Sequence, residues 1–307
     1  MNSRLRARLG ASLFRRGHFI DLLPVLLPAL LIVDIGLYAP RFIARPPDAA
    51  SADRIIWAAF SMSFTFLLVM AGGLSMAVLL RAIPTFSTCW RIIKAYALIG
   101  LTLALIEPSL VRHNLAVGPV GELILTGAKD AANFQRWPNV LAKCSILAAI
   151  GAAIALGWQA SSVDERELAW RLESLRLLLT VWTLTLASGV LEVTALFRYG
   201  ASASVDSQSL EGQADAIAIG AGLIFSILLL IILGPAVVRL ERRFKALAVE
   251  AAATELRAGR MFSLEQWSIS RGLVGRPLEN SQSALKFILP LATGLAADLL
   301  RRYFGRS

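Results

Sequence analysis

The stretch that decides the fold is residues 216–238, AIAIGAGLIFSILLLIILGPAVV, which contains no charged side chain. About 20 apolar residues in an α-helix cross a hydrocarbon core roughly 30 Å thick, so this stretch can span a bilayer. The rest of the chain has the same character, because 56% of its 307 residues are hydrophobic and 17% are charged. Soluble proteins carry about 25% charged residues. The chain is therefore predicted to be an integral membrane protein.

Five further apolar stretches of similar length precede this one. The six predicted spans are Phe19–Ala39, Ile55–Leu79, Ile92–Val111, Val140–Trp158, Ser174–Phe197 and Ala214–Val238. The predicted fold class is all-α, a polytopic bundle of six transmembrane helices with a helical C-terminal tail. Residues 1–18 form a basic N-terminus, residues 19–238 the six-span domain, and residues 239–307 the tail.

Lysine and arginine are distributed unevenly over the connections. With six spans, 23 of the 31 basic residues fall on the side that holds both termini, and 8 fall on the other side. The side richer in Lys and Arg faces the cytoplasm. We therefore expect a multi-pass protein of the inner (plasma) membrane with both termini in the cytoplasm. Trp57, Trp90, Trp137 and Trp158 stand at predicted span ends, where tryptophan is enriched at the membrane interface.

Three acidic residues, Asp34, Glu107 and Glu192, stand at membrane depth in predicted spans. An unpaired charge in hydrocarbon costs roughly 3 kcal/mol or more, so such residues commonly mark functional sites. Each lies within about two turns of the outer end of a span that runs outward. If these helices are neighbours, the three carboxylates converge on one outward-facing acidic site for a cation or a proton.

An arginine follows each acid five to seven positions later: Arg41, Arg112 and Arg198. Such an arginine can extend toward the interface, pair with the acid and neutralise it. Ion pairs or interhelical hydrogen bonds that only anchor helix ends are the more frequent explanation of intramembrane acids. We rank an ion pathway second and a catalytic carboxylate site third.

Polar and small residues share the helix face of Glu192. Helical spacing places Thr185 and Ser188 on this face, and Tyr38 is the corresponding polar residue near Asp34. A polar face has no favourable contact with lipid, so we expect it to point into the bundle. Rows of glycine, alanine and serine in the spans predict close helix contacts, within one chain or between chains.

Two predicted spans are expected to extend as helices beyond the membrane, the fifth at its start and the sixth at its end. Ser162-Val163-Asp164-Glu165 resembles a capping box, and Glu167 and Arg171 are four residues apart, so the fifth span is predicted to begin well inside the cytoplasm. After the sixth span the helix is predicted to continue toward Leu256. One face of this extension is apolar and needs a partner helix; its members are Leu240, Phe244, Leu247 and Ala251.

The last part of the tail contains two short predicted helices. Ser263 begins the first, which carries Trp267, and the second has the apolar core Phe287–Ala297. Because this core contains Pro290 and is too short to span, we expect it at the membrane interface or against the cytoplasmic ends of the spans. Phe244, Trp267 and Leu289 are the candidate residues for interactions of the tail.

Several classes of function lack their usual residues. The chain has no GxxxxGK[ST], GxGxxG, HExxH, CxxC or TVGYG motif, and it has two cysteines and two histidines. We expect no metal site and no cofactor, and an enzyme is disfavoured, although a carboxylate-only membrane enzyme stays open. The basic cluster Arg239–Lys245 directly follows a span, so it indicates topology and not nucleic-acid binding.

Two functions remain after these exclusions. The leading prediction is a channel or transporter-like bundle for an ion or small solute. The alternative is a non-transporting membrane effector, sensor or scaffold that acts through its cytoplasmic tail. Three intramembrane acids favour transport, while the absence of a convincing inverted repeat weakens it. Expected partners are the lipid bilayer, a second copy or another membrane subunit, and a cytosolic protein at the tail.

Overall fold

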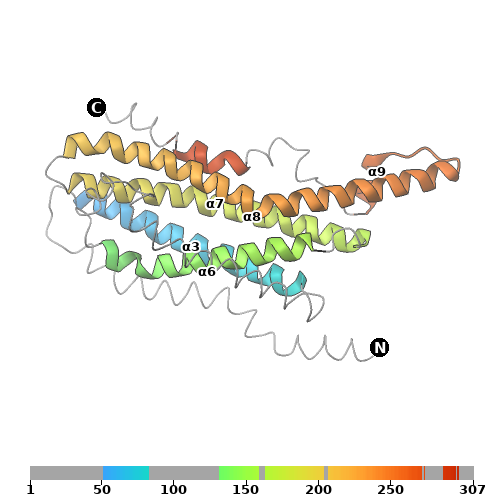
Figure 1. Ribbon diagram of the computed structural model, residues 1–307, viewed down its shortest axis with the longest axis horizontal. Helices are drawn as coiled ribbons and strands as arrows, with labels where there is room; N and C mark the ends of the chain where they lie inside the picture. Colours follow the sequence, from blue (N-terminus) through green and yellow to red (C-terminus); the bar gives the residue numbers. More distant parts are fainter. Residues whose placement is uncertain are drawn as a thin grey trace, which may run out of the picture.

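The computed structural model describes residues 51–82, 131–158, 163–203, 207–271, 273, 286–294 and 296. All regular structure in these ranges is α-helical, as predicted (Figure 1). The helices are α3 (Ser51–Ala82), α6 (Ala131–Gly157), α7 (Glu165–Ser202), α8 (Ser207–Arg257) and α9 (Leu264–Ser270). A further helix at 286–294 is called the terminal helix below. The first and third predicted spans lie outside the described residues.

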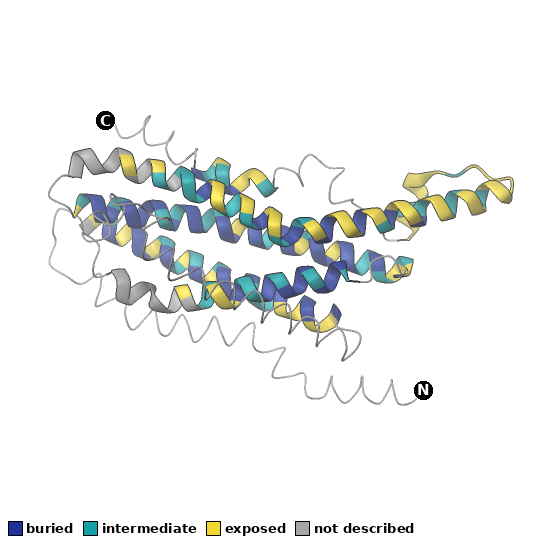
Figure 2. Cartoon of the chain, viewed as in Figure 1, coloured by how far each residue is buried: buried dark blue, intermediate teal, exposed yellow. Residues whose placement is uncertain are grey.

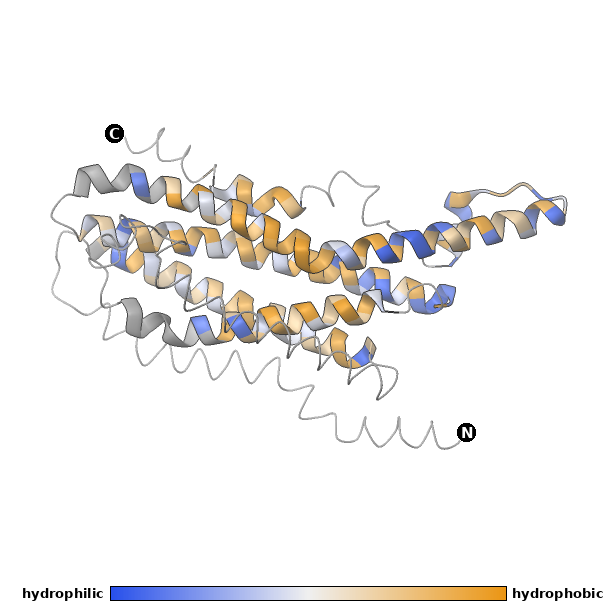
Figure 3. Cartoon of the chain, in the orientation of Figure 1, coloured by the Kyte–Doolittle hydropathy of each residue, from blue (hydrophilic) through white to orange (hydrophobic). Residues whose placement is uncertain are grey.

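Three of these helices are long and apolar enough to cross a membrane. They contain the candidate spans Ala52–Ala82, Glu165–Ser202 and Ile219–Arg257. Figure 3 shows that apolar residues dominate the middle of the bundle, whereas hydrophilic residues gather toward its ends and on the distal part of α8. This pattern indicates a membrane protein, in agreement with the composition.

The fourth predicted span falls on α6, which differs from the expected helix. Its apolar part, Leu141–Gly157, is shorter than the three candidate spans. At 1.5 Å per residue it is roughly 26 Å long, close to the lower limit for crossing a bilayer. The helix also begins earlier than expected, because residues 131–139, assigned from sequence to the outer connection, already belong to α6.

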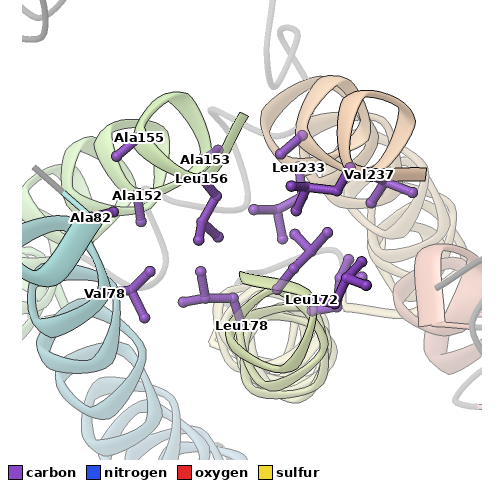
Figure 4. Packing of buried hydrophobic residues seen from close by; sticks show 14 of the residues in the cluster. Val78, Ala82, Ala152, Ala153, Ala155, Leu156, Leu172, Leu178, Leu233 and Val237 are labelled. Carbon is purple, nitrogen blue, oxygen red and sulfur yellow. The ribbon is translucent and has the colours of Figure 1, made fainter. Parts of the chain in front are cut away.

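The four long helices pack around a common core. Helix α7 contacts both α3 and α8, and α6 packs against α3 and α8. Figure 4 shows Val78, Leu156, Leu178 and Leu233 from the four helices pointing toward one another. Between apolar helices in lipid, small residues stabilise the bundle by letting helices approach closely. A Cβ on Gly189 of α7 would lie 2.9 Å from the ring of Phe64, so this close approach requires glycine.

Helix α8 is much longer than a membrane span. Its 51 residues correspond to roughly 76 Å at 1.5 Å per residue, about two and a half times the thickness of the hydrocarbon core. Its distal half projects beyond the other helices, and α9 returns along it (Figure 1). Gly259 makes the turn with φ 70°, a left-handed conformation that favours glycine at a helix end. We call residues 239–270 the stalk.

The apolar face predicted on the stalk is covered by the chain itself. Leu240, Phe244 and Leu247 are buried and belong to the main core cluster. The ring of Trp267 in α9 meets the ring of Phe244 edge-on, with centroids 5.7 Å apart. Ser263 caps α9 by accepting a hydrogen bond from the backbone nitrogen of Gln266, at 3.4 Å. The partner helix required by the sequence is therefore supplied within one chain.

The terminal helix, expected from sequence at the membrane interface or against the cytoplasmic ends of the spans, lies alongside α7 and α8 in the structure. The Thr183 hydroxyl of α7 donates to the backbone oxygen of Lys286 at 3.0 Å. The backbone nitrogen of Leu291 donates to the Ser226 hydroxyl of α8 at 3.2 Å. A Cβ on Gly222 would lie 2.8 Å from the carbonyl oxygen of Pro290. A glycine and two hydroxyls thus provide the space and the partners for this helix.

Candidate functional site

Glu192 of α7 is buried in the interface with α3. Only 5% of the residue is exposed. The indole Nε1 of Trp57 in α3 donates a hydrogen bond to Glu192 Oε1 at 3.1 Å. An indole N–H can only donate, and a carboxyl oxygen accepts in both protonation states. This contact therefore supplies a buried acid with a partner from a neighbouring helix.

A second aromatic residue, Tyr199, packs against this contact. Tyr199 follows Glu192 by seven residues, which returns it to nearly the same face of the helix. Its ring stacks on Trp57, with centroids 6.0 Å apart and an interplanar angle of 15°. Trp57 itself is 0% exposed. The sequence predicts Trp57 at the membrane interface because it stands at a span end, and the structure adds that its indole is buried between α3 and α7.

A buried arginine stands at the same end of the bundle. Arg54 is 2% exposed and lies in the first turn of α3, three residues before Trp57. The sequence assigned it to an outer connection. Arg198, the predicted ion-pair partner of Glu192, is half-buried. Its position six residues after Glu192 turns it about 240° around the helix, away from the face shared by Glu192 and Tyr199.

The convergence of three acids stays a prediction. Five of its residues lie outside the part of the chain that the structure describes: Asp34, Tyr38, Arg41, Glu107 and Arg112. Glu192 and Thr185 are both buried, so their shared face points into the bundle as predicted, and Ser188 is half-buried.

Hydroxyl groups continue from Glu192 along the α3–α7 interface. Thr185 Oγ1 lies 2.8 Å from the carbonyl oxygen of Val181 and 3.3 Å from that of Leu67 across the interface. Near the other end of α3, Trp182 Nε1 donates to Ser75 Oγ at 2.9 Å. These hydroxyls are satisfied by backbone or tryptophan partners. Together with Trp57 and Glu192, they connect the two helices at several levels.

Ser61 is the exception among these hydroxyls. It is 1% exposed, and its Oγ has no hydrogen-bond partner among the described residues. It lies one turn after Trp57 in α3. Unused hydrogen-bonding capacity therefore lies close to the buried acid.

At the opposite end of the bundle, an arginine side chain connects α7 to the end of α6. Arg171 of α7 is 5% exposed and donates to the carbonyl oxygens of Leu156 at 3.0 Å and Trp158 at 2.7 Å. Its Nε also donates to Glu167 at 2.9 Å, as the spacing predicted. The last carbonyls of a helix have no partner within it, so Arg171 caps the end of α6. The start of α7 is thereby fixed to the end of α6.

Two further arginines connect this end to the stalk. Arg243 of α8 donates to the backbone oxygen of Val163 from Nε at 3.1 Å and from Nη2 at 2.9 Å. Arg271, directly after α9, forms an ion pair with Glu165 of α7 at 2.7 Å. The stalk is therefore attached to the start of α7 at both its base and its returning end.

The fold brings two of the three predicted tail residues together and leaves the third, Leu289, on another element. Phe244 and Trp267 contact each other, and Phe244 is only 1% exposed. Leu289 is 40% exposed on the terminal helix, which lies against α7 and α8. The sequence did not predict the exposed apolar row of the stalk, because two of its four members, Ala246 and Ala253, are alanines.

Within the described ranges, no three residues among His, Cys, Asp and Glu are placed to hold a metal ion. Comparison with known proteins gives no match to a family model, to a curated protein or to a solved structure.

Proposed function

We propose that this protein is a non-transporting membrane scaffold that acts through its stalk, paired in parallel with the stalk of a second copy. The observation that carries the proposal is a row of exposed apolar residues on the distal part of α8, which projects beyond the other helices of the bundle (Figure 1). This row consists of Ala246, Val249, Ala253 and Leu256, and we call it the seam.

The seam has the spacing of a coiled coil. Its members are separated by three, four and three residues, the alternation of a and d positions in a heptad repeat. All four are exposed, and Val249 and Leu256 are 69% and 68% exposed. Figure 2 shows the same contrast, with exposed residues along the distal part of α8 and buried ones in the bundle. The opposite face of α8 is occupied by Phe244 and its neighbours.

Charges beside the seam favour a parallel second copy. In this heptad Lys245 is a g position and Glu250 is the following e position, which face each other across a parallel pair. Their side chains are 68% and 67% exposed and have long contacts within the chain, 3.8 Å to Glu241 and 3.7 Å to Arg243. Two stalks anchored in one bilayer also project in the same direction. The common direction of two stalks and the charges of Lys245 and Glu250 therefore both favour parallel pairing.

Membrane anchoring compensates for the short length of the seam. Two heptads alone give a weak coiled coil in water, because ordering a short helix is costly. Here the helix is already formed, and attachment to a bundle in the membrane raises the effective concentration of a second stalk. The attachment of the stalk through Arg243 and Arg271 limits the freedom that pairing would remove.

Disulfide cross-linking in native membranes tests the pairing. Cys89 and Cys144 are first replaced by alanine, and Val249→Cys or Leu256→Cys is then introduced. The matched control is Thr254→Cys, exposed on the same helix but away from the seam. We expect oxidised dimers from both seam positions and none from the control. Equal cross-linking at all three positions, or none at the seam, would contradict the proposal.

A second candidate is permeation of a proton or cation past Glu192. The specific observation is an acid 5% exposed within a candidate span, one helix away from the unpartnered hydroxyl of Ser61. Flux into proteoliposomes tests it, with Glu192→Gln compared to wild type. The scaffold proposal predicts no flux in either protein. Flux in wild type that disappears in Glu192→Gln would replace the scaffold with a channel or transporter.

A further inference from the structure

We propose that the junction of α7 and the terminal helix binds the headgroup of an anionic phospholipid, with Arg176 and Lys286 as its cationic contacts. This site is separate from the seam and does not depend on pairing of the stalk. Its residues belong to two segments more than 100 positions apart in the sequence.

Hydrogen bonds fix Lys286 at this junction. Its Nζ donates to Thr180 Oγ1 of α7 at 2.8 Å, while its backbone oxygen accepts from Thr183 Oγ1 at 3.0 Å. Arg176 lies one turn before Thr180, so both residues share a face of α7. The Lys286 ammonium thus lies at Thr180, on the face of α7 that also carries Arg176.

The charges of Arg176 and Lys286 affect each other there. Lys286 lies outside the three candidate spans; burial lowers its pKa, and nearby Arg176 lowers this pKa further. Two cations in proximity are favoured by an anion between them, and phosphate oxygens accept several charge-assisted hydrogen bonds. Glu173, one turn before Arg176, is exposed and leaves one excess positive charge among these three residues.

Exposed apolar residues flank the cations and favour a lipid over a soluble anion. Leu177 and Leu184 of α7 are 49% and 51% exposed, and Ile288 of the terminal helix is 52% exposed. Arg176 lies toward the end of α7 that carries the stalk contacts, and the distribution of basic residues predicts this end to lie at the cytoplasmic face of the membrane. A phospholipid could place its phosphate at the cations and its acyl chains along these residues. Basic pockets at this depth bind anionic headgroups in other membrane proteins.

Native mass spectrometry of the purified full chain tests the site. The protein is given equal amounts of phosphatidylglycerol and phosphatidylcholine with the same acyl chains, and the bound lipid is counted. We expect preferential retention of phosphatidylglycerol. Arg176→Gln and Lys286→Gln should each weaken this retention about fivefold, the effect of one basic residue near an anionic surface. Arg166→Gln, an exposed arginine at the start of α7, is the matched control and should have no effect.

Two additional measurements show whether a substitution acts through charge or through misfolding, and whether the site binds a lipid or free phosphate. Lys286→Arg keeps the positive charge and should restore retention if Lys286→Gln acts through charge. Inorganic phosphate in millimolar excess should not displace the lipid, because it lacks acyl chains. Equal retention of both lipids, unchanged retention in both Gln variants, or displacement by inorganic phosphate would overturn the proposal.

Discussion

Glu192 is held in an apolar bundle by contacts that no single helix could supply. The indole of Trp57 in α3 donates a hydrogen bond to Glu192. The ring of Tyr199, on the same face of α7 as Glu192, stacks on this indole. A buried acceptor without its donor would lose free energy of folding, because water cannot replace the bond in a dry interface. This contact therefore stabilises the antiparallel pairing of α3 and α7.

A double-mutant cycle measures this contact. Trp57→Phe and Glu192→Leu, alone and combined, should give a coupling free energy of about 1 kcal/mol, the scale of interhelical hydrogen bonds in membranes. The measurement is reversible unfolding in detergent. Trp170→Phe, at the opposite end of the bundle, should be additive with Glu192→Leu. Additivity of both pairs would show that the Trp57–Glu192 bond contributes nothing.

Single residues were predictable where helical periodicity alone decides their direction. The spacing of Thr185 and Glu192 correctly placed both in the bundle interior. The role of Trp57 was not predictable, because its partner is 135 positions away and tryptophan at a span end usually faces the interface. The burial of Arg54 was not predictable either, because α3 begins at Ser51, before the apolar run that defines the predicted span.

At the scale of elements, the end of α6 depends on a side chain from α7. Arg171 satisfies two carbonyl oxygens there and also bonds Glu167. Arg171→Met should lower the free energy of unfolding by about 2–3 kcal/mol, because buried carbonyls lose charged donors. Thermal unfolding checks this value. Arg166→Met removes an exposed arginine from the same helix and should change stability by less than about 0.5 kcal/mol; equal effects would contradict the capping role.

Two glycines of α8 provide a matched test of the terminal helix. A Cβ on Gly222 meets the backbone oxygen of Pro290 at 2.8 Å, whereas a Cβ on Gly220 meets nothing within 4 Å. Gly222→Ala should therefore displace the terminal helix and destabilise the protein by about 1–3 kcal/mol. Gly220→Ala should be neutral or stabilise by up to about 1 kcal/mol through helix propensity. Thermal unfolding distinguishes the two, and the same sign for both would refute the packing.

Helix starts could be predicted only approximately. Asp164 caps α7 by accepting from the backbone nitrogen of Glu167 at 2.8 Å, two residues after the serine that begins the predicted capping box. Asp and Ser are nearly equivalent caps, so sequence alone does not choose between them. The position of the terminal helix was not predictable either. Hydropathy shows that a segment is too short to span, but it does not show which helices it packs against.

At the scale of the whole molecule, α8 makes the bundle and the stalk one continuous element. The attachment of α9 depends on Trp267, whose ring packs on Phe244. Trp267→Ala should free α9 from the stalk at a cost of about 2 kcal/mol, which is roughly a thirtyfold loss of hydrogen-exchange protection in that segment. Ile269→Ala removes an exposed side chain and should have no such effect. Unchanged exchange in Trp267→Ala would show that α9 is held by other contacts.

Hydropathy predicted the helical architecture, but it did not predict the seam. Long apolar runs predicted the candidate spans in α3, α7 and α8, and the stripe that includes Phe244 predicted a partner helix. The seam escaped prediction because two of its four members are alanines, which give little periodic signal. It became visible only when the structure showed which face of α8 is already covered.

The oligomeric state of the full chain in nanodiscs tests the central claim most directly. Single-molecule subunit counting is carried out on wild type, on the combined variant Val249→Glu and Leu256→Glu, and on the control Thr254→Glu. Pairing through the seam predicts dimers for wild type and control, and monomers for the seam variant, because like charges would face each other at buried positions. Monomers in all three proteins, or dimers that survive the seam substitutions, would contradict the account.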